Sequence, residues 1–294
     1  MDPMSARSAE PAESPDRREF SFTDRDFRRV CALIHARAGI ALAASKRDMV
    51  YSRLARRLRA LGLNSFEHYL DQLESGAFAA REQDEWQCFT NALTTNLTAF
   101  FREAHHFDAL AAHLRAHRPN PKLRLWCSAA STGEEPWSMA IAACEAFDSL
   151  QPPVEILATD IDTNVLAVAE RGVYPVERIE GLDAERKRKF FQRGAGPQDG
   201  LCRVLPALRT LVQFRPLNLL LADYGLRGPY DAIFCRNVMI YFDKPTQRRV
   251  LERLAPLLAP EGLLFAGHSE SFLHAADLIR SCGRTIYQRA GKHS

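Results

Sequence analysis

The chain has 294 residues, of which 46% are hydrophobic and 26% charged, and its formal net charge is only +3. These values match ordinary globular proteins and exclude a disordered chain, a coiled coil and a membrane-embedded protein. The length allows two domains, because single hydrophobic cores stop growing at about 250 residues. A charge this small does not by itself indicate a nucleic-acid partner.

No apolar run approaches the roughly 18 residues that a membrane-spanning helix needs, and the first twenty residues lack the apolar segment of a secretory signal. We therefore expect a cytoplasmic protein that does not insert into the membrane. The seven cysteines, at positions 31, 88, 127, 144, 202, 235 and 282, form no C-x-x-C pair. This spacing indicates reduced thiols, and neither a disulfide framework nor a zinc ribbon.

The first part of the chain predicts a small helical domain. Residues 1–19 are rich in Pro, Ser and charge and predict a flexible tail. A helix is expected from Thr23, with Asp26 three residues on as a capping partner, to Ala38, and Gly39 is its stop signal. Further helical patterns at 46–61, 64–73 and 79–93 complete a helical domain over residues 20–93.

The pattern at 46–61 has one apolar and one basic side. Val50, Leu54, Leu58 and Leu61 fall on one stripe, and the opposite side carries Arg53, Arg56, Arg57 and Arg59. A solvated surface helix explains this pattern, and so does a docking surface for an acidic partner.

After a connection at 117–121, short apolar runs alternate with helical patterns. The runs are 123–129, 154–161, 211–217, 230–235 and 263–267, and the helical patterns are 134–147, 164–171 and 246–258. This alternation predicts an α/β domain over residues 122–294, with a mainly parallel sheet covered on both faces. Residues 173–210 break the alternation with a helix-like stretch, a glycine-rich RGAGPQDG segment and a short strand pattern, which together predict an inserted antiparallel β-subdomain.

Ligands of such sheets bind beyond the carboxyl ends of the strands. The first run is followed by SAASTGEEPWS at 128–138, where small residues and Gly133 allow close backbone approach, but neither G-x-G-x-x-G nor a P-loop occurs. Glu134 and Glu135 stand at the head of the next helix. The helix dipole alone explains acids there. They also repel a pyrophosphate and favour a ligand with an ammonium group.

Asp160 ends the second run, where a carboxylate can accept hydrogen bonds from both hydroxyls of a ribose, whereas Asp162 fits the cap of the next helix equally well. A small-residue turn, an acid at a helix head and a ribose acid describe a site for S-adenosylmethionine. After the fourth run, Asn237 and Tyr241 are further site candidates, although a buried turn also explains the asparagine. His105 and His106 have no third ligand at metal-binding spacing, so no metal is expected.

Several motifs in order now indicate a family. TTNLTAFFREAHHF, SAASTGEEPWSMA, ATDID, FRPLNLL and FCRNVMIYFDK resemble the CheR family of chemotaxis receptor methyltransferases over about residues 20–290, with minor departures such as Trp137 where a tyrosine is usual. The resemblance implies a small all-α domain, a linker over 94–121 that starts the cofactor site, and a Rossmann-like, S-adenosylmethionine-dependent methyltransferase domain with an inserted antiparallel β-subdomain. It implies methylation of glutamate side chains on the cytoplasmic helices of chemoreceptors.

The resemblance also implies roles for single residues. Arg102 and Tyr241 would lie nearest the transferring methyl group and act as catalytic residues. Glu135 would bind the amino group of the cofactor and Asp160 its ribose. The full implied cofactor-binding set is Asn96, Thr98, Arg102, Glu135, Asp160, Asn218, Leu219, Cys235, Arg236 and Asn237.

The substrate chemistry bears on partners as well. A glutamate nucleophile is already ionised at neutral pH, so no general base is expected. Receptor helices rich in glutamate favour the docking interpretation of Arg53, Arg56, Arg57 and Arg59. In some family members the β-subdomain holds a carboxyl-terminal tether of the receptor, and we expect a monomer. A nucleic-acid methyltransferase is disfavoured by the small charge and the missing N-P-P-Y tetrad, and a non-enzymatic sensor by the intact motif residues.

Overall fold

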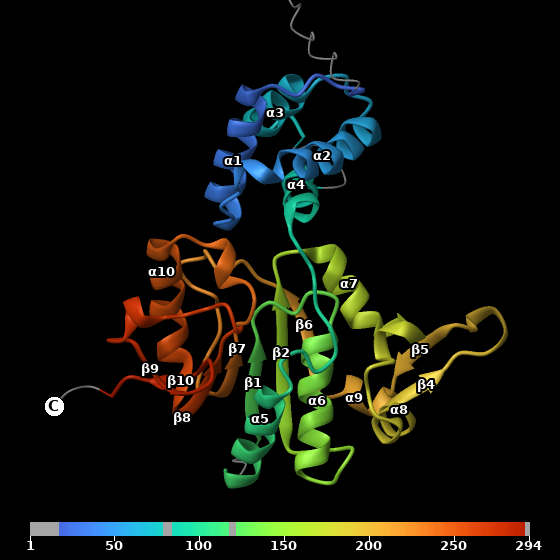
Figure 1. Cartoon of the computed structure of the whole chain (residues 1–294), viewed down its shortest axis with the longest axis vertical. Coiled ribbons are helices and arrows are strands. Elements are labelled where there is room, and N and C mark those ends of the chain that lie inside the picture. The colour runs from blue at the N-terminus through green and yellow to red at the C-terminus, as the bar shows by residue number, and fades with distance from the viewer. Residues whose placement is uncertain (1–17, 79–83, 118–121, 292–294) are drawn as a thin grey trace, which may run out of the picture.

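The protein is described here by a computed structural model, which covers residues 18–78, 84–117 and 122–291 (Figure 1). Most of the predicted tail, residues 79–83 of the fourth predicted helix and most of the predicted 117–121 connection lie outside these residues. A helical domain stands over an α/β domain, and a single loop segment after α4 leads from one to the other (Figure 1).

The helical domain contains α1 (Asp24–Ala38), α2 (Arg47–Leu61), α3 (Phe66–Ser75) and α4 (Glu85–Leu93), with a 3-10 turn at Ala44–Lys46. The side chain of Thr23 accepts the N–H of Asp26, and the carboxylate of Asp26 accepts the N–H of Thr23, so the predicted capping box starts α1. Gly39 ends the helix in the left-handed conformation, with φ of 72°. The predicted limits of α1 are confirmed.

The apolar stripe predicted for α2 forms part of the core of this domain. Val50, Leu54 and Leu58 are fully buried, whereas Leu61 is only partly buried. On the opposite side, Arg57 makes two hydrogen bonds to the buried carboxylate of Glu85, at 3.0 and 2.6 Å. The hydroxyl of Tyr69 donates to the same carboxylate at 2.9 Å, so this ion pair joins α2, α3 and α4.

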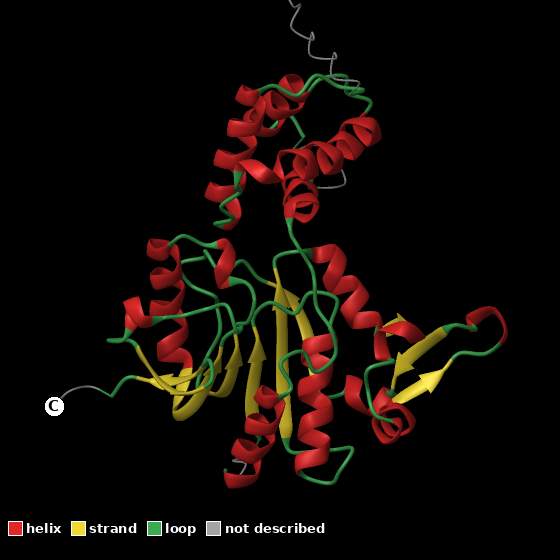
Figure 2. Cartoon of the chain, viewed as in Figure 1, coloured by secondary structure: helices red, strands yellow, loops and turns green. Residues whose placement is uncertain are grey.

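The α/β domain is built on a seven-stranded sheet in the order β6-β2-β1-β7-β8-β10-β9 (Figure 2). Its strands are β1 (Leu123–Cys127), β2 (Val154–Asp160), β6 (Val212–Pro216), β7 (Tyr230–Phe234), β8 (Leu258–Phe265), β9 (Ile279–Gly283) and β10 (Ile286–Arg289). The first five are mutually parallel, as predicted, and β10 pairs antiparallel with both β8 and β9. The sequence analysis did not predict the β9–β10 hairpin, and it placed the start of β8 five residues too late.

Both faces of the sheet are covered by α5 (His105–Ala116), α6 (Glu134–Ala146), α7 (Thr163–Arg171) and α10 (Lys244–Leu254). Leu125 and Cys127 of β1 belong to the core that contains α5 and α6, and Trp126 between them belongs to the core that contains α10. This alternation is the period of two that a strand imposes. Helix α5 was not predicted, and α10 ends at Leu254 rather than 258, where a 3-10 turn at Ala255–Leu257 follows it.

The predicted antiparallel subdomain is present beside the main sheet (Figure 1). It contains β3 (Val173–Pro175), α8 (Ala184–Phe190), β4 (Phe191–Arg193) and β5 (Leu201–Val204), with strand order β3-β5-β4, and the short α9 (Pro206–Arg209) leads back to β6. Further 3-10 turns lie at Val176–Ile179, Gly196–Gln198, Met239–Tyr241 and Leu273–Ala275. The ring of Phe100 packs edge-on against Tyr174 and Phe191, both at 5.3 Å, and so anchors the subdomain to the segment that enters the α/β domain.

Hydrogen bonds join the helical domain to the carboxyl ends of the strands. The N–H of Ala41 donates to the carbonyl of Tyr241 at 2.9 Å, and the side chain of Asn218 donates to the carbonyl of Arg37 at 2.8 Å. The side chain of Gln87 donates to the carbonyl of Ile161 at 2.8 Å. The helical domain therefore covers the sheet edge where ligands of such folds bind. In the described ranges, no helix combines the length and apolarity needed to cross a bilayer.

Candidate functional site

A pocket lies between the two domains at the carboxyl ends of the parallel strands. Of the eleven residues predicted to bind the cofactor or act in catalysis, ten line it: Asn96, Thr98, Arg102, Glu135, Asp160, Asn218, Leu219, Arg236, Asn237 and Tyr241. Cys235 is fully buried and does not line the pocket, and neither do Arg53, Arg56, Arg57 and Arg59 of α2. The structure thus brings together residues that the sequence separates by 145 positions.

Glu135 lies at the floor of the pocket because of a tight turn before α6. Gly133 has φ of 99°, and a Cβ there would lie 2.7 Å from the Cβ of Ala169, so only glycine fits. Glu135 accepts a 2.6 Å hydrogen bond from Arg236 and a weak 3.2 Å bond from the thiol of Cys127. Burial raises the pKa of Glu135, and the charge of Arg236 opposes that rise. A cationic group in the pocket would favour the ionised carboxylate further.

The neighbouring acid, Glu134, has a different role. Its carboxylate accepts a 2.6 Å hydrogen bond from Thr132 and forms an ion pair with Arg178. It is fully buried and does not line the pocket. Of the two acids at the helix head, only Glu135 is therefore available to a ligand.

Asp160 and Asp162 also have different roles. Asp160 accepts the N–H of Ser131 at 2.7 Å and the N–H of Asp162 at 2.9 Å, and burial raises its pKa from 3.8 to about 6. Each of its oxygens keeps a lone pair for a ligand hydroxyl. Asp162 caps α7 with one oxygen, and its other oxygen accepts hydrogen bonds from Thr94 at 2.6 Å and Asn96 at 2.9 Å. The helix-cap alternative for Asp162 is confirmed.

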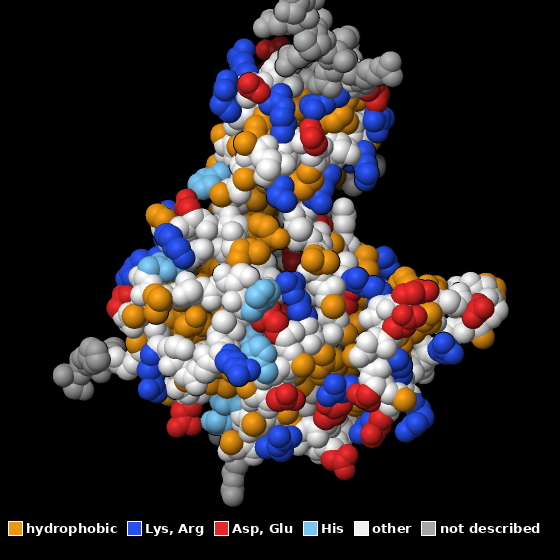
Figure 3. All heavy atoms as spheres, in the orientation of Figure 1, with side chains coloured by type: hydrophobic (Ala, Val, Ile, Leu, Met, Phe, Trp, Pro, Cys, Tyr) orange, Lys and Arg blue, Asp and Glu red, His pale blue; other side chains and the backbone are white. Residues whose placement is uncertain are grey.

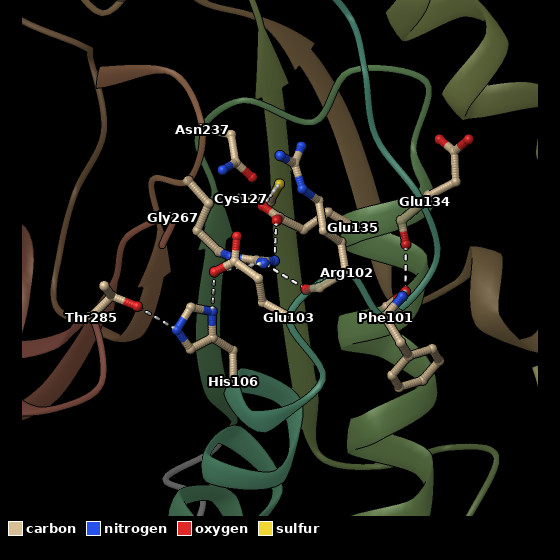
Figure 4. A network of polar contacts seen from close by, with 12 residues as sticks. Phe101, Arg102, Glu103, His106, Cys127, Glu134, Glu135, Asn237, Gly267 and Thr285 are labelled. Atoms are coloured by element: carbon tan, nitrogen blue, oxygen red, sulfur yellow. Dashed lines mark hydrogen bonds and ion pairs between the residues drawn. The ribbon is translucent and has the colours of Figure 1, made fainter. Parts of the chain in front are cut away.

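The loop after β7 is shaped by a residue that the sequence analysis missed. Glu270 is buried, and its carboxylate accepts the N–H groups of Asn237 at 3.0 Å, Ile240 at 3.3 Å and Gly267 at 2.5 Å. Asn237 adopts φ of 58°, and its amide lies against Gly267, where a Cβ would approach it to 2.3 Å (Figure 4). A lone Glu in a polar segment gives no sequence signal for this role.

Arg102 and Tyr241 line the pocket from two different turns of the chain. Arg102 lies in the turn between the 94–98 segment and α5, and its guanidinium donates to the carbonyl of Leu97 at 3.0 Å. Tyr241 ends the 3-10 turn Met239–Tyr241, which α1 and its following loop hold from above. Both side chains are partly exposed, so both remain accessible to a substrate at the pocket mouth.

The lining also contains residues that the sequence did not indicate. The helical domain contributes an apolar wall of Ile40, Ala41, Leu42, Ala43 and Met49. Ser128 also belongs to the lining, and its hydroxyl is buried beside the thiol of Cys235.

These groups fit S-adenosylmethionine. Glu135 suits its ammonium group, Asp160 suits its ribose diol, and the apolar wall suits its adenine. No group of three or more His, Cys, Asp or Glu side chains suited to a metal ion occurs among the residues described. A mixed sheet of this order, with five parallel strands, and a pocket with these groups are those of an S-adenosylmethionine-dependent methyltransferase.

Comparison with known proteins gives the family. Residues 25–94 match the family model described as "CheR methyltransferase, all-alpha domain", and residues 96–288 match "CheR methyltransferase, SAM binding domain". The two matches cover most of the chain, and the chain belongs to the CheR methyltransferase family. The predicted family, fold class, enzyme class and cofactor are thereby confirmed.

Close relatives are similar over nearly their whole length. "Chemotaxis protein methyltransferase 2" of Pseudomonas aeruginosa is 56% identical over 276 residues, which cover 92% of this chain and 95% of the relative. "Chemotaxis protein methyltransferase" of Escherichia coli K12 is 52% identical over 267 residues, 91% of each chain. Among solved structures, magnesium protoporphyrin IX methyltransferase from Synechocystis PCC 6803 with bound SAH aligns at 17% identity over 64% of this chain and 67% of that one, with a TM-score of 0.33.

Proposed function

We propose that the protein methylates glutamate side chains of chemoreceptors to glutamate methyl esters, as part of sensory adaptation in chemotaxis, and that it acts in the cytoplasm as a monomer. The names of its relatives, chemotaxis protein methyltransferases, support this proposal. The observation that carries it is one pocket that combines cofactor-type acids, Glu135 and Asp160, with Arg102 and Tyr241 at the accessible side.

In this proposal the cofactor is held by side chains on both sides of the pocket. Glu135, kept in place by Arg236, binds the amino group, and Asp160 binds the ribose. Asn218, Leu219 and the chain at Cys235–Arg236 bound the adenine side. Asn96 and Thr98 form the wall facing α6, where Asn96 is fixed by its bond to Asp162. When bound, S-adenosylmethionine supplies a sulfonium methyl group that a carboxylate oxygen can take, with the C–S electron pair left on sulfur.

The chain's own groups then have to orient a glutamate and exclude water. The substrate carboxylate, with an ordinary pKa of about 4.3, is ionised at neutral pH and needs no general base. Arg102 binds that carboxylate through charge-assisted hydrogen bonds and leaves a lone pair aimed at the methyl group, and the hydroxyl of Tyr241 provides a second contact. Such alignment contributes up to about 7–11 kcal/mol in favourable cases.

The proposed docking surface on α2 contains fewer arginines than the four that the sequence indicated. Arg57 is tied to Glu85, and Arg53 donates to the carbonyls of Ala92 and Thr94, so both hold the domain together. Arg56 is exposed and has no ion-pair partner in the part of the chain that the structure describes. Arg59 pairs with Glu19 but stays 54% exposed. We propose receptor docking at Arg56 and Arg59, on the domain where several Lys and Arg side chains lie on the face in view (Figure 3).

The β-subdomain is the proposed site for a receptor tether. Its strand order leaves β3 and β4 as edges, and an extended peptide can add to an exposed strand edge by main-chain hydrogen bonds.

The test is incubation with tritiated S-adenosylmethionine and membranes that carry chemoreceptors. Base-labile label on the receptor supports the proposal, whereas label on RNA or DNA, or no label at all, contradicts it. Arg102→Ala should lower turnover far more than the affinity for S-adenosylmethionine. Full turnover in that variant would refute the role of Arg102 and leave the methyl-transfer assay itself intact.

A further inference from the structure

The turn that carries Arg102 is held in an uncommon backbone conformation on both sides of that residue. Phe101 has φ of 51° and Glu103 has φ of 58°, and neither is glycine. Left-handed conformations are strained for residues with a Cβ, and they persist only where the surroundings hold them. The two residues that fix the direction of Arg102 therefore each need an external support.

The support of Phe101 comes from α6 and its neighbours. Its N–H donates to the hydroxyl of Ser138 at 2.9 Å, and Ser138 in turn donates to the carbonyl of Glu134 at 2.6 Å (Figure 4). Its ring packs against Phe107 at 4.9 Å and under the guanidinium of Arg186 at 4.0 Å. These contacts fix the residue before Arg102.

The support of Glu103 is electrostatic. Its side chain is only 11% exposed, and one oxygen lies 3.1 Å from a ring nitrogen of His268. The other oxygen lies 3.5 Å from the guanidinium of Arg236, which is fully buried. The same nitrogen of Arg236 donates to the carbonyl of Arg102 at 2.5 Å, and its neighbour donates to Glu135 at 2.6 Å.

Arg236 is thus shared by two carboxylates, those of Glu103 and Glu135, and by the carbonyl of Arg102. Glu135 pulls the guanidinium toward the pocket floor, and Glu103 holds it on the side of the turn. Without Glu103, the guanidinium of Arg236 loses one of its two carboxylate partners and can shift toward Glu135, away from the carbonyl of Arg102. Arg236 would keep its bond to Glu135.

We propose that Glu103 is a positioning residue for methyl transfer: through Arg236 it fixes the backbone of Arg102, and so aims the Arg102 guanidinium at the substrate carboxylate. This inference rests on the proposed role of Arg102. It assigns to Glu103 an effect on turnover and not on cofactor binding, because the Arg236–Glu135 pair stays in place.

The first test compares Glu103→Ala with a matched control, Glu261→Ala. Glu261 also lies 3.1 Å from a histidine ring, that of His117, but at an exposed site. We expect Glu103→Ala to lower kcat for receptor methylation by at least about tenfold, since small misplacements cost that much, with the Kd for S-adenosylmethionine changed less than about twofold. Glu261→Ala should change neither. An unchanged kcat, or equal losses in kcat and cofactor affinity, overturns the inference.

A double variant separates positioning from loss of folding. If Glu103 acts through Arg102, adding Glu103→Ala to Arg102→Ala should change kcat by less than about twofold, whereas independent effects would multiply. Glu103→Gln keeps the packing and removes only the charge, and it should also lower kcat. This variant serves as the test if Glu103→Ala does not fold. Absence of label on the receptor would refute the proposed function, and a harmless Arg102→Ala would refute the role of Arg102 on which this inference rests. A damaging Arg102→Ala beside a harmless Glu103→Gln and Glu103→Ala would refute only this inference.

Discussion

Arg236 donates a 2.6 Å hydrogen bond to Glu135, a residue 101 positions earlier in the chain, and the two side chains are 0% and 10% exposed. Removing one member of such a pair leaves an uncompensated buried charge, which costs about 3–5 kcal/mol. We expect Arg236→Met to lower the free energy of unfolding by that amount, as measured by urea denaturation. The double variant Arg236→Met/Glu135→Gln should recover part of the loss.

The control is an ion pair of the same length at the surface. Arg248 and Asp277 also lie 2.6 Å apart, but their side chains are 39% and 58% exposed. Arg248→Met should cost less than about 1 kcal/mol because water screens the pair. Equal losses at the two sites would contradict the view that burial makes the Arg236 pair critical.

The raised pKa of Asp160 predicts a pH-dependent stability. Its pKa is about 6 in the folded protein and 3.8 ordinarily, so the protonated carboxyl favours folding. That contribution is complete below pH 3.8 and is lost as the pH rises through 6. The side chain in Asp160→Asn is neutral at every pH. Without cofactor, the free energy of unfolding of this variant minus that of the parent should rise by about 1–2 kcal/mol as the pH increases from 5 to 7.5. A stability difference that stays constant over this range argues against the shifted pKa.

Gly133 should tolerate no side chain. A Cβ there would meet Ala169 at 2.7 Å and the hydroxyl of Tyr174 at 2.8 Å, in addition to the strain of φ at 99°. Gly76 has φ of 74° with nothing within 4 Å, so Gly76→Ala carries only the backbone strain, about 1–2 kcal/mol. We expect Gly133→Ala to lower the thermal midpoint more than Gly76→Ala and to weaken binding of S-adenosylmethionine, because the turn also places Glu135.

Substitutions at the neighbouring Arg56 and Arg57 of α2 should affect different properties: Arg57 the stability of the protein, and Arg56 the rate of receptor methylation. Arg57→Ala leaves the buried Glu85 without its partner and should lower the free energy of unfolding by about 3 kcal/mol. Arg56→Glu should leave stability within about 0.5 kcal/mol but slow receptor methylation at low salt, since attraction to an acidic helix is reversed. The effect should fade at high salt. A receptor methylation rate that is independent of charge at Arg56 would remove it from the docking surface.

Local patterns were sufficient to predict most of the fold. The short apolar runs at 123–129 and 154–161 and the stop signal at Gly39 correspond to elements found in the structure. Helix α5 was missed although Phe107, Leu110 and Leu114 have helical spacing, because the family resemblance assigned residues 94–121 to a linker. The hairpin of β9 and β10 was missed because β9 is a mostly exposed edge strand and β10 is only four residues long, so neither shows a clear apolar period.

The site was predictable where a residue acts through its place on an element, and not where it acts through a distant partner. Glu135 and Asp160 follow from their positions at a helix head and a strand end. Nothing near Glu270 indicates that it accepts three N–H groups from two loops, and nothing near Arg57 indicates Glu85. Such pairs depend on the packing of whole elements, which a local pattern does not contain.

The bond from Ala41 to the carbonyl of Tyr241 has a consequence for protein engineering. Because the loop after α1 forms one wall of the pocket, a chimera with the helical domain of another family member exchanges part of the binding site along with it. A swap made between α4 and the following segment would pair a foreign wall with the original floor. A graft that keeps residues 37–49 from the same parent as the α/β domain should preserve the pocket.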